Sequence, residues 1–304
     1  MRFMIIVKAT KESEAGVMPK QELFAAMATY HEELAKAGVL LDASGLQASS
    51  KGWRVKYSGK KRSVVDGSFT ESKELIAGYT MIQVKSREEA VEWTRRFPNP
   101  AGEGIDTEIE VRQLFEMDDF EKNEETDRFR KLEVERKNSL LGVSISASLV
   151  RRIVERQENE LTGLRPTRRL ETSVRRSPMK FLSVYRNKER NTPPSPAEME
   201  RMGKLVEEGF KSGKLLAVEG CMPSALGARV RQDTGTVTVK DGPFSESKEV
   251  IGGLAIIQAS SKAEAIEYVR EFLLVAGDGE CELRQLYEAG GAMPCQDQAA
   301  KAQA

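Results

Sequence analysis

The hydrophobic and polar positions of the chain predict the same series of short strands and amphipathic helices twice. Apolar runs at 3–7 and 181–185 are typical of strands that are covered on both faces. A helix with apolar residues at helical spacing follows each run, and Gly38 or Gly213 is expected to end it. In the first half, the expected helices span 19–38 and 86–97, and the later strands span 39–46, 53–65 (a hairpin), 76–84 and 109–115.

The two halves are copies of one sequence unit. The segments VVDGSFTESKELIAGYTMIQV (64–84) and VKDGPFSESKEVIGGLAIIQA (239–259) align at a constant offset of 175 residues. We therefore expect a first repeat, a charged helical connector, a second repeat and a disordered tail, with the boundaries 1–117, 118–178, 179–290 and 291–304.

Without its hairpin, each repeat has the order βαββαβ, which is typical of a ferredoxin-like α+β sandwich. That fold places both helices on one face of the sheet and leaves the other face bare. The runs at 3–7 and 76–84 are apolar on both sides, so the second face must also be covered. We expect the two sheets to pack together as an intramolecular pseudo-dimer with a ligand-sized cavity between them. The sequence leaves open whether the chain also assembles into homo-oligomers.

Charge and composition narrow the classes of partner. Lys plus Arg balance Asp plus Glu at 47 each, which argues against binding to nucleic acid or an acidic membrane. The apolar run near the N-terminus is too short to cross a membrane. The three cysteines, Cys221, Cys281 and Cys295, form no CxxC pair and suit a reducing compartment, so we expect a cytoplasmic protein.

Metal and nucleotide cofactors are not expected. His31 is the single histidine, and we expect it at the surface or half-buried on the first helix. One histidine with scattered cysteines gives no recognisable zinc site or Ser-His-Asp arrangement. The sequence also contains no Walker A or GxGxxG motif.

The most closely repeated segment combines a turn with charged residues. Asp66-Gly67-x-Phe69 and its second copy predict a tight turn in which Asp accepts backbone N–H groups, Gly adopts a positive φ and Phe anchors the loop. The charges that follow would suit polar ligand binding or acid–base chemistry. The catalytic candidates are Asp66, Glu71, Lys73, Asp241, Glu246 and Lys248, and the ligand-binding candidates are Glu74, Arg112, Glu249 and Arg284.

Arginines on the strands are the remaining candidates. Arg112 and Arg284 lie among apolar positions of the last strand, where an inward guanidinium would pair with a motif glutamate or bind an anionic ligand. The hairpin residues Arg54 and Arg229 are expected to lie in solvent.

The repeated motif resembles the signature of the YCII-related family, DGPF branch. The second copy carries the full Asp-Gly-Pro-Phe, whereas Ser68 replaces the proline in the first. The following Ile-x-Gly (76–78 and 251–253) and the Glu-x-Arg of the last strands (110–112 and 282–284) fit the same family. The resemblance implies a dimeric α+β-barrel-like fold with a cavity between sheets, and an activity that is mostly unestablished.

The family also offers two functional settings. A related branch includes a ring-dehydrochlorinating enzyme that uses a histidine near the start of the first helix, but Met18-Pro19-Lys20 stand there in this chain. Genes of the DGPF branch often neighbour alternative sigma factors, which implies a regulatory setting.

Two functions of different classes therefore remain open. The first is a small-molecule-binding protein, with acid–base catalysis as an extension of that role. The second is a protein-interaction module linked to sigma-factor regulation that docks through the connector. The connector carries a helix-spaced apolar stripe formed by Leu149, Val150, Ile153, Val154 and Leu161. The alternative is that the connector is a flexible charged tether.

Overall fold

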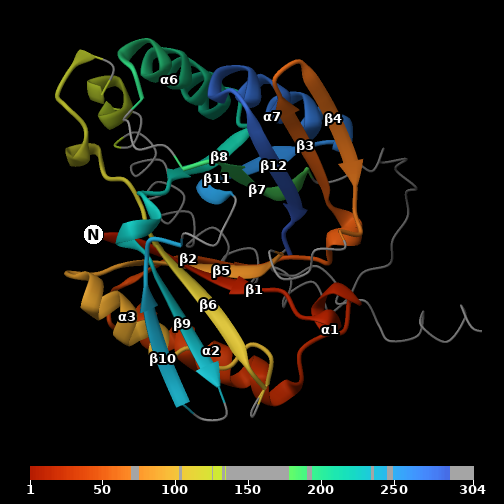
Figure 1. The fold of residues 1–304 in the computed structure, drawn as a ribbon, viewed down its shortest axis with the longest axis vertical. Coiled ribbons are helices and arrows are strands. Elements are labelled where there is room, and N and C mark those ends of the chain that lie inside the picture. Colours follow the sequence, from red (N-terminus) through yellow and green to blue (C-terminus); the bar gives the residue numbers. More distant parts are fainter. Residues whose placement is uncertain are drawn as a thin grey trace, which may run out of the picture.

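The computed structural model contains two six-stranded antiparallel sheets that face each other, with helices on their outer faces (Figure 1). It describes residues 1–69, 75–102, 105–124, 126–131, 134, 178–189, 194–233, 236–244 and 249–287. Most of the connector and all of the expected tail lie outside these residues. None of the helices in this described part is long and apolar enough to cross a membrane.

Both repeats follow the predicted order of elements. The first comprises β1 (Arg2–Lys8), α1 (Lys11–Glu14), α2 (Gln21–Lys36), β2 (Leu40–Gly45), η1 (Ser49–Lys51), β3 (Trp53–Ser58), β4 (Lys61–Asp66), β5 (Ile76–Gln83), α3 (Arg87–Arg95) and β6 (Thr107–Gln113), followed by η3 (Met117–Asp119). The second comprises β7 (Met179–Asn187), α6 (Pro196–Lys211), β8 (Leu215–Gly220), η4 (Ser224–Leu226), β9 (Ala228–Asp233), β10 (Thr236–Asp241), β11 (Val250–Ala259), α7 (Lys262–Ala276) and β12 (Gly279–Gln285).

Local sequence signals set the ends of the helices. Ser195 and Glu198 form a reciprocal capping box at the start of α6, where Pro196 occupies the first turn. Gly38 and Gly213 follow α2 and α6 with φ values of 71° and 70°, as expected of glycines that close a helix. The short helix α1, which Thr10 caps, was not predicted.

Each repeat contributes four strands in the ferredoxin-like order, β6-β1-β5-β2 and β12-β7-β11-β8. The hairpins, however, are exchanged. The β3–β4 hairpin of the first repeat pairs with β12, and the β9–β10 hairpin of the second pairs with β6. In Figure 1 the orange hairpin accordingly lies beside blue β12, and the cyan hairpin lies beside yellow β6.

The hydrophobic pattern of the hairpin explains why it fits the other sheet. Trp53, Val55 and Tyr57 alternate with more exposed residues along β3, and their side chains are buried. They join the core beneath α6 and α7, which also contains Phe181 and Val269. The hairpin thus widens the sheet on which the helices of the other repeat pack.

The inner faces of the two sheets meet in a separate apolar cluster. Met4, Tyr79 and Met81 from the first repeat contact the layer that holds Leu182 and Leu254 from the second. The void among these side chains is about 10 Å³, roughly the space of a single water. Among the described residues of this cluster, the expected ligand-sized cavity between the sheets is not found, because large side chains from both faces fill the space.

Candidate functional site

The motif aspartates lie on the surface and connect the two repeats. Asp66 forms an ion pair with Lys262, the first residue of α7, and Asp241 forms the matching pair with Arg87, the first residue of α3. The side chains of Asp66 and Asp241 are 68% and 67% exposed. Their positions suit docking of each hairpin onto the opposite repeat, and the burial that would adapt a carboxylate for acid–base chemistry is lacking.

The glycines of the motif adopt no positive φ, so that expectation is wrong. Gly67 and Gly242 are required for a different reason, which is close backbone approach. A Cβ atom on Gly67 would lie 1.8 Å from the carbonyl oxygen of Ser49, and one on Gly242 would lie 1.8 Å from that of Ser224. Only glycine lets the motif loop of each repeat pack this closely against the backbone of the segment that holds Ser49 or Ser224.

The motif phenylalanines anchor their loops, as predicted. Phe244 is buried, and the guanidinium carbon of Arg229 lies 4.2 Å from the centre of its ring. Arg54 lies over Phe69 in the same way at 4.1 Å. Each loop therefore holds an arginine of its own hairpin in place through a cation–π contact.

These hairpin arginines are not solvated, which corrects the expectation for them. The side chains of Arg54 and Arg229 are only 16% and 12% exposed, because each hairpin strand lies against the last strand of the opposite repeat. Arg54 Nη2 donates to Glu282 Oε2 at 2.8 Å, and Arg229 Nη2 lies 3.8 Å from Glu110 Oε2.

Arg112 and Arg284 are buried, and among the described residues they pair with glutamates outside the motif. Each pairs with the glutamate two residues earlier, on the same face of its strand, at 3.4 Å for Arg112 and 3.2 Å for Arg284. Arg284 Nη2 also donates to Glu14 at 2.8 Å. Two equivalent groups result, here named the first and second charge clusters: Lys8, Glu110, Arg112 and Arg229; and Arg54, Arg186, Glu282 and Arg284.

The carboxylates of both clusters stay ionised despite their burial. Burial alone would raise the pKa of Glu110, but Lys8, Arg112 and Arg229 outweigh it and hold that pKa below the ordinary value. The same balance lowers the pKa of Glu282. Since each cluster combines groups from both repeats, it fastens the exchanged hairpin to its sheet.

Most of the remaining motif candidates belong to parts of the chain that the structure does not describe. Glu71, Lys73, Glu74, Glu246 and Lys248 lie outside the described residues. Glu249 is partly exposed, 3.6 Å from Lys56. No group of three or more His, Cys, Asp and Glu side chains that could hold a metal occurs within the described ranges.

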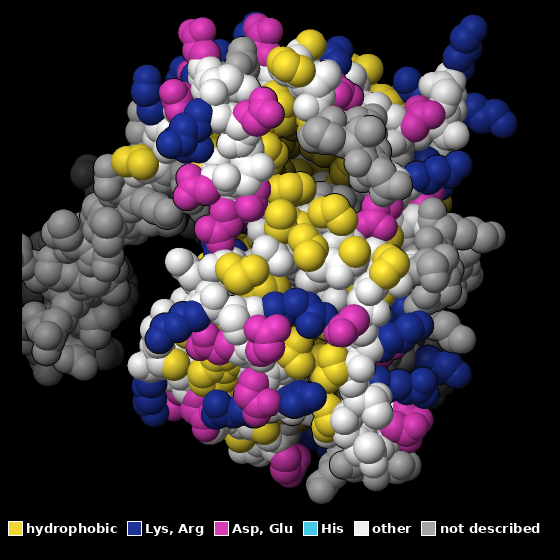
Figure 2. Space-filling view, turned by 60° about the vertical axis from the view of Figure 1, so that its left-hand side comes forward, with side chains coloured by type: hydrophobic (Ala, Val, Ile, Leu, Met, Phe, Trp, Pro, Cys, Tyr) yellow, Lys and Arg dark blue, Asp and Glu magenta, His cyan; other side chains and the backbone are white. Residues whose placement is uncertain are grey.

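A large cavity lies elsewhere, beneath the helices of the second repeat. Its volume is about 410 Å³, within the roughly 300–1,000 Å³ typical of small-molecule sites. It opens between α6, α7 and the outer face of β7, β8 and β11, and none of the described candidate residues lines it. We call this cavity the α6 pocket; Figure 2 shows apolar side chains gathered around a hollow.

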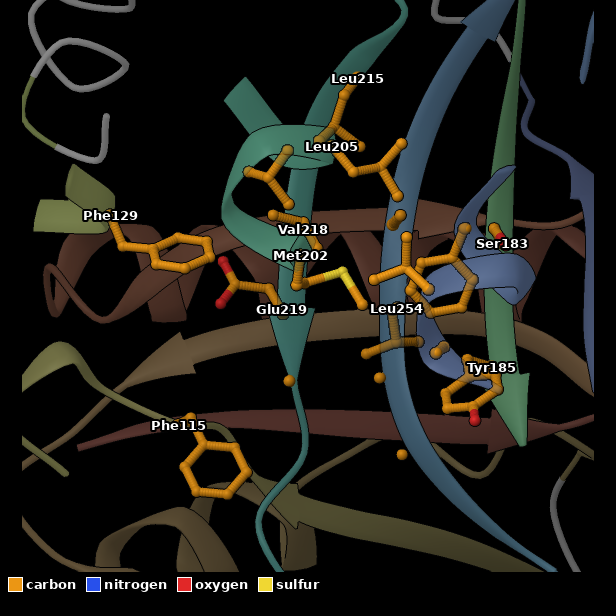
Figure 3. Close-up of a pocket in the computed structure, with 18 of the residues that line it drawn as sticks. Phe115, Phe129, Ser183, Tyr185, Met202, Leu205, Leu215, Val218, Glu219 and Leu254 are labelled. Carbon is orange, nitrogen blue, oxygen red and sulfur yellow. The ribbon is translucent and has the colours of Figure 1, made fainter. Parts of the chain in front are cut away.

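The walls of the α6 pocket are mainly apolar. In Figure 3, Met202 and Leu205 of α6 and Leu215 of β8 lie on one side, and Ser183 and Tyr185 of β7 lie on another. Among the residues that the structure describes, three charged side chains border the space, and each has a partner. Arg2 donates to Glu219 at 2.8 Å, and Glu198 caps the start of α6. The pocket is therefore suited to an uncharged ligand.

Larger and more polar side chains occupy the equivalent positions of the first repeat. Tyr30, His31 and Thr80 stand where the second repeat has Leu205, Val206 and Ala255. His31 Nε2 lies 3.0 Å from Thr80 Oγ1, and the Tyr30 ring packs edge-on against Trp93 and Phe97. Burial lowers the pKa of His31, whose half-buried place on α2 confirms the prediction for it. The two repeats thus share a fold while differing at this site.

The fold and its interior define a class of protein: a tandem of ferredoxin-like repeats whose sheets pack face to face. The YCII-related domain matches residues 1–117 and 179–289, so the chain belongs to the YCII-related family. A curated relative from Rhizobium meliloti (strain 1021), the uncharacterized protein R00369, is 36% identical over 73 residues. The match covers 24% of this chain and 59% of that protein.

Proposed function

We propose that the protein binds one uncharged, largely apolar small molecule per chain in the α6 pocket. The observation that carries this proposal is the cavity of about 410 Å³ with its apolar walls. Burying apolar surface contributes about 25 cal/mol per Å², so an apolar ligand would gain most of its affinity from these walls.

The charges around the pocket favour a neutral ligand. Arg2 is already paired with Glu219, and Glu198 bonds with the backbone and hydroxyl of Ser195. A carboxylate or phosphate entering the pocket would lose its hydration without gaining an uncompensated cation among the described lining residues.

A matched pair of fluorescent probes tests this proposal. N-phenyl-1-naphthylamine is neutral, and 8-anilinonaphthalene-1-sulfonate adds a sulfonate to the same ring skeleton. We expect saturable binding of the neutral probe at one molecule per chain, at least about tenfold tighter than the sulfonate. Absence of saturable binding of the neutral probe would contradict the proposal.

The first repeat supplies the variant that closes the pocket. Leu205→Tyr, Val206→His and Ala255→Thr together install the side chains that already coexist at the equivalent positions of the same fold. We expect this triple variant to lose probe binding, whereas Lys204→Ala, an exposed change on the same helix, keeps it. Equal binding by the triple variant and the wild type would place the probe elsewhere.

The other hypotheses remain predictions. Acid–base catalysis by Asp66 and Asp241 gains no support from their exposed ion pairs. An interaction role linked to sigma factors would rest on the connector, most of which lies outside the described residues. Loss of partner capture in a pull-down after deletion of 118–178 would favour that role. Membership of the DGPF branch and a cytoplasmic location also remain expectations from the sequence.

A further inference from the structure

One side of the α6 pocket is built by a segment that begins at the end of the first matched repeat and lies mostly beyond it. The family match of the first repeat ends at residue 117, yet Phe120 and Phe129 both line the pocket. We call residues 115–124 and 126–131 the strap. Figure 3 shows Phe115 and Phe129 reaching the pocket from one side, opposite β7.

Contacts with α6 hold the strap in place. Arg128 forms an ion pair with Glu207. The ring of Phe129 lies over Gly203, where an added Cβ would come within 3.3 Å of its Cε2 atom. The counterpart of Gly203 in the first repeat is Ala28, so the missing side chain is particular to the helix that meets the strap.

The start of the strap is fastened to both sheets. Arg2 Nη2 of β1 donates to the carbonyl oxygen of Phe115 at 2.6 Å, while Arg2 Nη1 donates to Glu219 of β8. The Phe115 and Phe120 rings lie 5.1 Å apart, which continues the apolar wall. The aromatic side chains are thus positioned by described contacts at both ends of the strap.

We propose that the strap is the size-selecting wall of the α6 pocket, with Phe120 and Phe129 contacting the bound molecule. This inference rests on the proposed function. Removing two phenyl rings from the wall removes apolar contact with a small ligand and makes room for a larger one. The strap should therefore affect the choice between ligands of different size as well as affinity.

Two neutral dyes of different size, N-phenyl-1-naphthylamine and the larger Nile red, provide the test on the full-length chain. We expect Phe120→Ala with Phe129→Ala to weaken binding of the smaller dye about tenfold and that of Nile red much less. Gly203→Leu should displace Phe129 and shift the preference in the same direction. Ala28→Leu, the matched change on the exposed face of α2, should leave both affinities unchanged.

Each outcome decides between the two proposals. In one outcome, the wild type binds the smaller dye, and the double variant and Gly203→Leu bind both dyes with affinities within twofold of the wild type. That outcome would overturn the role of the strap and leave the pocket proposal intact. Equal weakening for both dyes would show that the strap only supports the fold, which would overturn size selection. No saturable binding to the wild type would overturn both proposals.

Discussion

The guanidinium of Arg54 donates to the carboxylate of Glu282 at 2.8 Å, although 228 residues separate them in the sequence. The contact exists because the hairpin that carries Arg54 pairs with the last strand of the second repeat, where Arg54 and Glu282 are direct partners. Glu282 also forms ion pairs with Arg186 and Arg284. A single buried carboxylate thus joins one hairpin to a sheet from the other half of the chain.

Loss of this hairpin arginine should destabilise the whole molecule. Arg54→Ala removes one partner of a buried carboxylate, and breaking such a pair typically costs about 3–5 kcal/mol. Because two arginines remain beside Glu282, we expect the lower end of that range. Denaturant unfolding monitored by circular dichroism measures the change. Lys61→Ala, an exposed substitution on the same hairpin, should stay within about 0.5 kcal/mol of the wild type; an equal loss in both variants would refute the role of the cluster.

The charge clusters also predict sensitivity to acid. The pKa values of Glu110 and Glu282 lie below 4.5 in the folded state, so the unfolded chain binds protons first as the pH falls. Their stabilisation is complete above pH 4.5 and is lost as the pH drops through the folded values. Unfolding free energies measured across this window should decline less steeply in Glu110→Gln with Glu282→Gln than in the wild type. The exposed change Glu92→Gln should keep the wild-type slope.

His31 should add a separate pH dependence at milder acidity. Burial lowers its folded pKa below 6.5, so protons bind preferentially to the unfolded chain. Unfolding free energy should therefore be highest above pH 6.5 and fall as the pH drops toward the folded pKa. His31→Val with Thr80→Ala installs the side chains of the second repeat and should remove this slope, because no other histidine is present. Urea titrations above and below pH 6.5 provide the comparison, and an unchanged slope would contradict it.

The two described cysteines should be inert in the folded protein. Burial raises the pKa of Cys221 to about 11, and it also raises the pKa of Cys281. Little thiolate is therefore present, and both cysteines are buried. Iodoacetamide at about pH 8 should modify both only after denaturation, as peptide mass spectrometry would show. Rapid modification of Cys221 in the native state would indicate that the sheets separate readily.

Much of the fold could be predicted because its signals are local. Periodic apolar residues, the Ser195 capping box and the closing glycines Gly38 and Gly213 determine where elements begin and end. The bare second face of each sheet also indicated that something must cover it. The hairpin exchange could not be predicted, because alternation along β3 shows which face is buried but not which strand lies alongside.

The candidate site was predicted less well, because the strongest repetition marks an interface. Asp66 and Phe69 recur in both copies where each hairpin meets the opposite repeat. The pocket instead arises where the copies differ. In the alignment of the two halves, Leu205 corresponds to Tyr30, and Ala255 corresponds to Thr80. These differences are visible in the sequence, but only the structure shows that Leu205 and Ala255 line the same cavity.

The hairpin exchange has a consequence for how the protein responds to dilution. When two separate chains trade hairpins, the arrangement forms by encounter and dissociates at low concentration. Here β3–β4 and its acceptor β12 lie in the same polypeptide, as do β9–β10 and β6. The exchange is therefore unimolecular, with the effective concentration of each hairpin set by the chain itself. The interlocked sheets should persist at any abundance of the protein, however scarce.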